Sequence, residues 1–493
     1  MKKFKYIWVA LLAVGALACS EDFLDKTPLD TINTSNFYQT ETDAISAING
    51  AYQPLQWPKL YNMRMWTSDI VAGNSVVGAG GADDGIETQD MANFVTTPDN
   101  AAALDLWRGP SPGILRCNLV LENVPGMAIS ETIKNRTLGE AHFLRGLYYF
   151  ILVQYFGDVP LVTKPVGPED NLRPFRDSKE LIYNLIIDDL TAAIDLLPER
   201  SKYGLADKGR ASKGSALGLL AKVQLTLGND QAVIDLISQL ETLDYVLNID
   251  YADNFKTNSN YKNGVESLFE IQYVGGSGLD FWSDANQASW LSTFTGPRGS
   301  DMVAGGWGWN QPTQEFVDSY EAGDKRKDVT IFYEGCPKFD GKDYDKAYSL
   351  TGYNLRKFLV TKAEAPTYDQ SPMNFPVLRY ADILLIKAEA LNNLGQTSAA
   401  EAPLNRVRER AGLAPVSGLS KADMKEKILH ERRMELAFEG QRWFDLIRVD
   451  GGQWGLDFLH SIGKTNAAPR HLLFPIPQIE RDANPNLTQN PGY

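Results

Sequence analysis

Residues 431–448 read E-R-R-M-E-L-A-F-E-G-Q-R-W-F-D-L-I-R, and they decide the fold that this sequence predicts. Five residues in and before this run share one line of a helix at 100° per residue, the position of a buried stripe: Met424, Ile428, Glu431, Glu435 and Phe438. Two carboxylates therefore point into the core, where an unpaired negative charge costs several kcal/mol. We expect them to pair with nearby cations, which are Arg406, Arg410, Arg432 and Arg442.

The ends of this helix are also marked. Ser420 and Asp423 form a start similar to a capping box, and Gly440 is suited to the left-handed conformation that ends a helix before a second one at 441–448. Two interpretations of the acids are open, a catalytic carboxylate pair or a structural charge network made of Glu431, Glu435, Arg406 and Arg442. Acids that pair with arginines between helices are more commonly structural, so the sequence favours the network.

Several phrases of the chain resemble the signatures of one family. Residues 473–477 (L-F-P-I-P) and 484–493 (N-P-N-L-T-Q-N-P-G-Y), together with the run above, are similar to the closing signature of the SusD/RagB family of nutrient-binding lipoproteins. Residues 139–160, 379–392 and 404–413 resemble further signatures, so the resemblance spans nearly the whole chain after its leader. It implies a mainly α fold, a SusD-like stack of helix pairs of tetratricopeptide type with long loop insertions and a few short strands.

The helical patterns themselves occur in pairs. The clearest lie at 138–156, 178–197, 210–227, 231–241, 380–394 and 398–411. The spacing of Ala388, Leu391 and Ala399 resembles half of a tetratricopeptide repeat, in which small residues let two helices approach closely, but no strict 34-residue period is present. Four polar residues on otherwise apolar helices are expected to be buried pairing groups: Glu140, Arg145, Asp382 and Glu389.

The amino terminus has the pattern of a bacterial export signal. Three lysines precede an apolar stretch at 6–17, and small residues come directly before Cys19, which predicts a signal peptide at 1–18. The junction resembles a lipoprotein box, in which the thiol of Cys19 is the lipid attachment site, followed by a tether at 19–30. The acidic residues after it resemble the signal for the outer face of the outer membrane. The alternative is an ordinary secreted protein with a chance cysteine.

Composition agrees with a single body on a lipid tether. The 493-residue chain carries a formal charge of −14, which argues against nucleic acid as a partner. No linker appears after residue 30, so we expect one domain at 31–493. Cys117 and Cys336 are the cysteines left after lipidation, and whether they pair is open.

Function is expected where the scaffold signatures stop, in loop-rich insertions at about 57–98 and 275–375. These stretches are rich in glycine and tryptophan, and long connections of this kind commonly bind something. Indole faces stack on the C–H faces of sugar rings while polar neighbours take the hydroxyls. The candidate ligand-binding residues are Trp57, Trp66, Asp69, Trp282, Trp290, Trp307 and Trp309. For each tryptophan the alternative is a plug that packs the loop onto the body.

Motifs for enzymes, metals and cofactors are absent from the sequence. The four histidines have no metal-ligand spacing, and no nucleophile elbow or phosphate loop is present. The favoured function is a non-catalytic surface lipoprotein that binds oligosaccharide or polysaccharide, and the resemblance implies delivery to a SusC-like TonB-dependent outer-membrane transporter. One alternative is a helical glycoside hydrolase, for which Asp69 and Asp301 are the available loop acids. Another is a peptide-binding member of the family or a helical scaffold.

Overall fold

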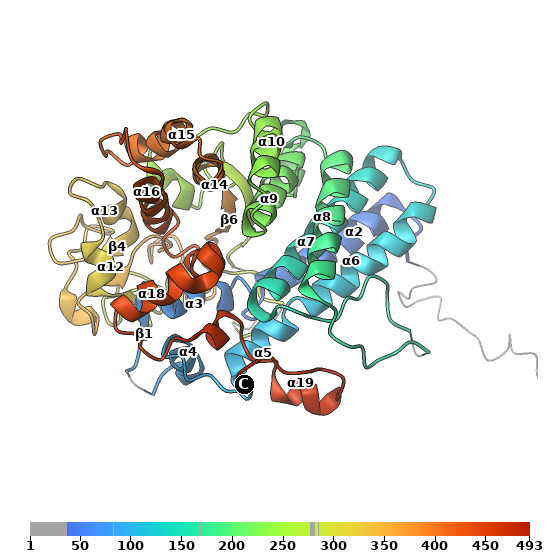
Figure 1. Cartoon of the computed structure of the whole chain (residues 1–493), viewed down its shortest axis with the longest axis horizontal. Coiled ribbons are helices and arrows are strands. Elements are labelled where there is room, and N and C mark those ends of the chain that lie inside the picture. The colour runs from blue at the N-terminus through green and yellow to red at the C-terminus, as the bar shows by residue number, and fades with distance from the viewer. Residues whose placement is uncertain (1–36, 82, 168, 277–281, 284) are drawn as a thin grey trace, which may run out of the picture.

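The computed structural model describes residues 37–493 apart from 82, 168, 277–281 and 284 (Figure 1). The predicted signal peptide, Cys19 and the tether at 19–30 lie outside the described residues. The fold is mainly α-helical, as the sequence predicts. None of the helices in the described part of the chain is both long and apolar enough to cross a lipid bilayer.

The body is a stack in which each helix packs on the next one along the chain. Its members are α2 (Glu41–Tyr52), α6 (Ser111–Asn123), α7 (Glu131–Phe156), α8 (Lys179–Leu196), α9 (Lys213–Thr226), α10 (Asp230–Leu240), α14 (Tyr380–Asn393), α15 (Thr397–Arg410) and α16 (Lys421–Glu435). Contacts run in that order from α2 to α10, then pass to α14, which touches both α15 and α16. Figure 1 shows the stack passing from α2, α6, α7 and α8 on one side to α14, α15 and α16 on the other.

Small residues and buried ion pairs hold neighbouring helices together. Gly113 of α6 lies so close to α7 that a Cβ there would be 2.1 Å from the ring of Tyr148. The guanidinium of Arg145 reaches Asp189 of α8 at 2.8 Å. The other expected pairing groups also have partners: Glu140 pairs with Arg210, Asp382 with Arg432, and Glu389 with Arg448. The prediction that these four residues are buried pairing groups is therefore confirmed.

Three two-stranded antiparallel sheets connect segments that are distant in the sequence. They are β1 (Ser75–Gly78) with β3 (Trp309–Pro312), β2 (Ser267–Ile271) with β6 (Phe375–Arg379), and β4 (Ile331–Phe332) with β5 (Asn354–Leu355). In the first sheet Val76 lies opposite Gln311, so the two predicted loop insertions are paired with each other. The second sheet closes the longer insertion at both its ends.

The two insertions contain more regular structure than the sequence suggested. The first holds α3 (Arg64–Val71), α4 (Ile86–Ala92) and β1, and α5 (Ala101–Arg108) follows it. The second holds α11 (Leu291–Thr295), α12 (Gln314–Asp318), α13 (Arg326–Thr330) and β3 to β5, while α17 (Arg442–Arg448), α18 (Gln453–Ser461) and α19 (Gln478–Ala483) complete the chain. Every residue of α3 is buried, polar ones included, so this helix has no exposed face.

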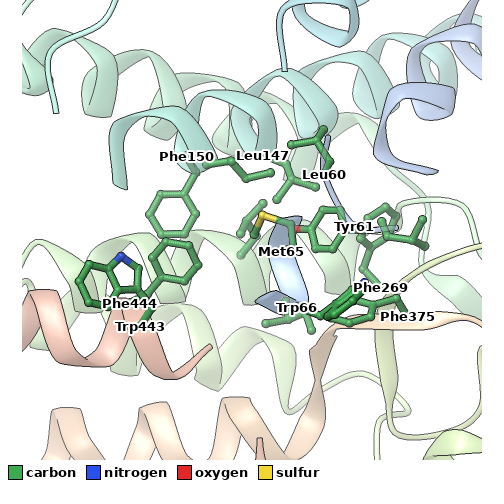
Figure 2. Packing of buried hydrophobic residues seen from close by; sticks show 14 of the residues in the cluster. Leu60, Tyr61, Met65, Trp66, Leu147, Phe150, Phe269, Phe375, Trp443 and Phe444 are labelled. Carbon is green, nitrogen blue, oxygen red and sulfur yellow. The ribbon is translucent and has the colours of Figure 1, made fainter. Parts of the chain in front are cut away.

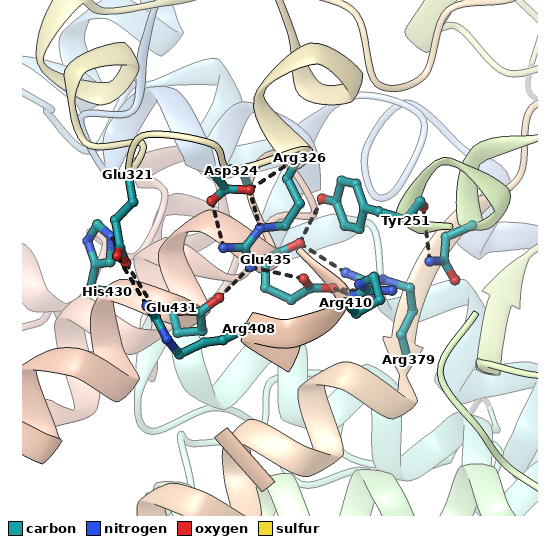
Figure 3. A network of polar contacts seen from close by, with 12 residues as sticks. Tyr251, Glu321, Asp324, Arg326, Arg379, Arg408, Arg410, His430, Glu431 and Glu435 are labelled. Carbon is teal, nitrogen blue, oxygen red and sulfur yellow. Dashed lines mark hydrogen bonds and ion pairs between the residues drawn. The ribbon is translucent and has the colours of Figure 1, made fainter. Parts of the chain in front are cut away.

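The two acids of α16 are fully buried and lie among arginines (Figure 3). The carboxylate of Glu431 contacts Arg326 at 2.6 Å and Arg408 at 2.9 Å. That of Glu435 contacts Arg410 at 2.5 Å, Arg379 at 2.9 Å and Arg326 at 3.2 Å. Burial alone would raise the pKa of Glu435, but these arginines hold that pKa well below its ordinary value.

The prediction that Arg406 and Arg442 pair with the buried acids of α16 is wrong. Arg406 is exposed on α15 and donates to the hydroxyl of Tyr380 at 3.4 Å. Arg442 is buried, but its guanidinium lies over the rings of Trp454 and Phe458, and no ion pair among the described residues includes it. The cations that replace them, Arg326 and Arg379, come from segments far away in the sequence, which helical spacing does not reveal.

The helix also ends earlier than predicted, at Glu435. Gly440 has the expected positive φ of 69°, but Phe438 has one too, 63°, so the predicted helical stripe does not extend to Phe438. The carboxylate of Asp69 accepts the backbone N–H groups of Phe438 at 3.2 Å and Gly440 at 3.0 Å. This buried carboxylate therefore stabilises the turn that ends α16.

Candidate ligand site

An aromatic cluster lies in the longer insertion, where four of the predicted tryptophans meet around Phe294. The rings of Trp282 and Trp307 stack with centroids 6.0 Å apart and planes at 18°. Beneath them Trp290 stacks on Phe294 at 5.4 Å, and Trp309 meets Phe294 edge to face at 5.6 Å. Trp282 is 63% exposed and Trp307 is half-buried, whereas Trp290 and Trp309 are buried. The cluster thus has an outer layer open to solvent and an inner packed layer.

The inner layer is attached to the first insertion at several points. The side chain of Asn62 donates to the carbonyl of Ala288 at 3.1 Å and accepts the backbone N–H of Trp290 at 2.6 Å. Gly85 has a φ of +59°, and a Cβ at this position would lie 2.4 Å from the ring of Trp309. A glycine is therefore required there for the first insertion to pack against Trp309.

A third exposed aromatic side chain lies in the same region, and the sequence analysis missed it. Tyr368 is 50% exposed. Its carbonyl accepts a hydrogen bond from the hydroxyl of Thr293 at 3.0 Å, and the carbonyl of Thr293 accepts the N–H of Trp307 at 2.9 Å. Tyr368 stands in a stretch with neither tryptophan nor a glycine cluster, so only its place in the fold associates it with the site. Asn62 was also missed, because only its contacts with Ala288 and Trp290 associate it with the site.

Two of the predicted ligand residues are buried in the core instead. Trp66 has no exposed surface and packs under the cluster, 6.0 Å from Phe294, among the apolar residues of Figure 2. Asp69 is also fully buried, where it accepts the backbone N–H groups that end α16 and the amide of Asn74 at 2.9 Å. Because neither presents surface to solvent, the structure assigns them to packing rather than to ligand contact. Both belong to α3, whose lack of an exposed face the sequence did not reveal.

Trp57 lies apart from this cluster. It is half-buried after the 3₁₀ turn Gln53–Gln56, and the guanidinium of Arg116 lies over its ring at 5.6 Å. That stacking is the arrangement expected for a loop plug on the body. The seven candidates are therefore divided between a cluster of four, a buried pair and one separate tryptophan.

The carboxylates required for the hydrolase alternative do not face each other across a site. Burial raises the pKa of Asp69 to about 6, and its oxygens are engaged with backbone and amide N–H groups. Asp301 is exposed and pairs with Lys342 and Lys362, which hold its pKa below the ordinary value. A glycosidase requires two carboxyl groups that both reach the sugar, and a fully buried one does not.

A cavity of about 450 Å³ lies near the loop that carries the outer tryptophans. It is bounded by α2, the turn Gln53–Gln56, strand β2 and the segment 206–210, and Gln287 of the tryptophan-bearing loop also lines it. No group of three or more metal-ligating side chains occurs among the residues that the structure describes.

Fold and site together define a class: a mainly helical protein that presents aromatic side chains from long connections between the helices of a stack. The chain belongs to the SusD family. Residues 265–493 match the model described as SusD family, and residues 22–225 match one described as starch-binding associating with outer membrane.

Named relatives and solved structures agree with this assignment. The chain is 28% identical to SusD-like protein P2 of Formosa agariphila over the full length of both, and 29% identical to a SusD-like protein of Bacteroides ovatus over 90% of this chain and 82% of that one. A laminarin-binding SusD-like protein superposes with a TM-score of 0.79 at 29% identity, covering 92% of this chain and all of the other. Surface glycan-binding protein A of Bacteroides thetaiotaomicron, in complex with laminarihexaose, gives 0.78 at 25% identity over 92% of this chain and all of that one.

Proposed function

We propose that this protein is a non-catalytic glycan-binding lipoprotein of the outer membrane, and that the outer layer of the aromatic cluster is its ligand platform. The observation that carries the proposal is the pair Trp282 and Trp307, stacked and open to solvent. An exposed indole that stacks on a second one forms a contiguous apolar patch, and such patches mark interaction sites. The exposed indole of Trp282, supported by Trp307, offers a flat apolar surface to the C–H groups of sugar rings.

The relatives support the same ligand class. Two of the solved neighbours are named for laminarin and laminarihexaose binding, and the family model that matches residues 22–225 is described as starch-binding. We therefore place β-glucans and starch first among the polysaccharides to be tested. Peptide is the second candidate, because the loops that form the platform are outside the scaffold signatures.

The proposal also includes a lipid anchor and a transporter partner. Lipid on Cys19 would hold the body at the cell surface, and the platform would pass its glycan to a SusC-like TonB-dependent transporter in the same membrane. The family description, association with the outer membrane, supports the location. The acidic net charge of −14 is compatible with a tethered body that does not adhere to anionic lipid by itself.

The direct test is native affinity electrophoresis of residues 20–493 in gels containing laminarin, starch, xylan or no polysaccharide. We expect retardation by at least one of them, and loss of that retardation in the double variant Trp282→Ala/Trp307→Ala. Phe175→Ala is the matched control, because Phe175 is an aromatic residue of similar exposure, 67%, in a different part of the chain.

Three outcomes would contradict the proposal or a part of it. Retardation of the double variant equal to that of the wild type would exclude the platform as the site. Binding of peptides in isothermal titration, with no retardation by any polysaccharide, would replace glycan by peptide as the ligand. Release of reducing sugar during incubation would contradict the non-catalytic assignment.

A further inference from the structure

The cavity beside the platform is lined by an unusual number of side-chain amides. They are Asn49, Gln53, Gln56, Gln272 and Gln287. Apolar surface comes from Phe269 and Ile271 of strand β2, both almost fully buried. A cavity with an apolar floor and a few polar groups on its walls has the composition of a small-molecule site.

The charged side chains that line this cavity are hydrogen-bonded within the protein. Arg210 donates to Glu140 at 3.0 Å, to Asp207 at 2.8 Å and to the amide oxygen of Asn49 at 2.8 Å. The carboxylate of Glu270 accepts the backbone N–H of Asn263 at 3.1 Å and the amide of Asn374 at 2.8 Å. The ammonium of Lys208 donates to the carbonyl of Ser259 at 3.3 Å, so all three charged groups are already engaged, and the cavity combines cations with an acid rather than presenting one sign of charge.

The amides, in contrast, keep part of their hydrogen-bonding capacity. The oxygen of Gln53 accepts from Arg116 at 3.1 Å, and the nitrogen of Gln56 donates to the carbonyl of Gln272 at 2.6 Å. Among the hydrogen bonds of the described residues, none uses the amide nitrogens of Asn49 and Gln53, the amide oxygen of Gln56 or the side chain of Gln287. Donors and acceptors are thus both available, which is the combination that a hydroxyl group requires.

From these observations we infer that the amide-lined cavity is a second subsite, which takes a neutral, hydroxyl-rich sugar unit of the same oligosaccharide whose neighbouring units lie on the aromatic platform. This inference rests on the glycan binding proposed above. The two sites share one loop, since Gln287 lines the cavity and Trp290 lies beneath the platform. Three residues of chain span at most about 11 Å, and the ring of Trp290 lies 5.1 Å from that of Trp282, so a ligand of several sugar units can extend from one site to the other.

The loop is also fixed relative to the cavity. The backbone N–H of Val274 donates to the carbonyl of Gln287 at 2.9 Å, directly after the strand that forms the cavity floor. The N–H of Ser289 donates to the carbonyl of Ser371 at 2.9 Å. These bonds fix residues 287–289 of the loop against the strand that forms the cavity floor, before any ligand binds.

The test compares short and long ligands. Isothermal titration of residues 20–493 would use the disaccharide and hexasaccharide of laminarin, cellulose and starch, together with an oligogalacturonate as an acidic probe. The cavity variant is Gln53→Ala/Gln287→Ala. The matched control is Gln239→Ala/Gln396→Ala, two exposed amides on α10 and before α15.

We expect the cavity variant to bind the hexasaccharide about tenfold more weakly, since it loses two hydrogen-bonding groups, and to bind the disaccharide as the wild type does. The platform variant Trp282→Ala/Trp307→Ala should lose both ligands. Equal hexasaccharide affinity in the cavity variant and the wild type would overturn the subsite while leaving the platform intact. Tighter binding of oligogalacturonate than of the neutral hexasaccharides would overturn the inference that the cavity takes a neutral sugar unit. A wild type that binds no saccharide would overturn both the subsite and the proposed function.

Discussion

Replacement of Glu435 by alanine should destabilise the fold and leave glycan affinity unchanged in the molecules that remain folded. Its carboxylate is fully buried and contacts three arginines at 2.5–3.2 Å. Removal of one partner from a buried ion pair costs about 3–5 kcal/mol, because the remaining charge stays buried without compensation.

Each of the three arginines keeps another carboxylate partner in this variant. We therefore expect the loss in the free energy of unfolding to lie at the lower end of that range, about 3 kcal/mol. Arg326 keeps Asp324 at 2.7 Å, and Arg379 keeps Glu439 at 2.7 Å. Arg410 keeps Glu266 at 3.1 Å. The backbone carbonyl of residue 435, which accepts from the hydroxyl of Tyr251 at 2.8 Å, is unaffected by the substitution.

The assay is urea denaturation followed by tryptophan fluorescence and circular dichroism, with glycan titration of the folded protein alongside. Glu409→Ala is the control, because Glu409 is an exposed acid on the neighbouring helix α15 and should change stability by no more than about 0.5 kcal/mol. The variant Glu435→Gln removes the negative charge but keeps the side-chain volume, so it separates these two contributions to stability. Unchanged stability together with lost glycan binding would refute the structural assignment of this residue.

Three further outcomes follow from the same structure, and a fourth follows from the predicted lipid anchor. Trp282→Ala should change the free energy of unfolding by less than about 1 kcal/mol, measured in urea, because most of the side chain is in solvent. Asp69→Ala should cost about 2–5 kcal/mol in the same assay without changing glycan affinity, since two buried N–H groups of the α16 turn lose their acceptor. Arg408 holds the pKa of Glu321 at about 2, and arginines lower that of Glu435, so the unfolded chain binds more protons. Stability should therefore fall as the pH drops below about 4.5 toward 2 in an acid titration, and a flat profile would contradict these ion pairs. Cys19→Ser should move the protein from the membrane to the soluble fraction on sedimentation of lysed cells, and continued sedimentation with the membrane would exclude the lipid anchor.

The sequence was sufficient to predict the helical stack and the burial of the α16 acids, because both depend on a period of 3.6 residues. It was not sufficient to predict which arginines meet those acids. Arg410 lies on the next helix and was found, but Arg326 and Arg379 lie 109 and 56 positions from Glu435 and approach it only through the tertiary fold. Arg442 is close in sequence, yet its helix points it toward Trp454 instead.

Prediction of the candidate site from the sequence is limited in the same way. Tryptophan content correctly directed attention to the longer insertion, but composition does not distinguish an exposed indole from a buried one. Trp282 and Trp66 both stand in the predicted insertions, and the difference between them is set by α3, a helix buried on all sides. Tyr368 carries no signal in the sequence, because its position beside Thr293 follows from hydrogen bonds between distant segments.

The scaffold and the ligand site are connected through one polar chain. Arg433 of α16 donates to the amide oxygen of Asn74 at 2.9 Å, and the amide nitrogen of Asn74 donates to Asp69 at 2.9 Å. Asn74 stands directly before β1, which pairs with β3 and so places Trp309 beneath the platform. The charged helix that forms the family signature therefore also fixes the strand on which the aromatic cluster is built.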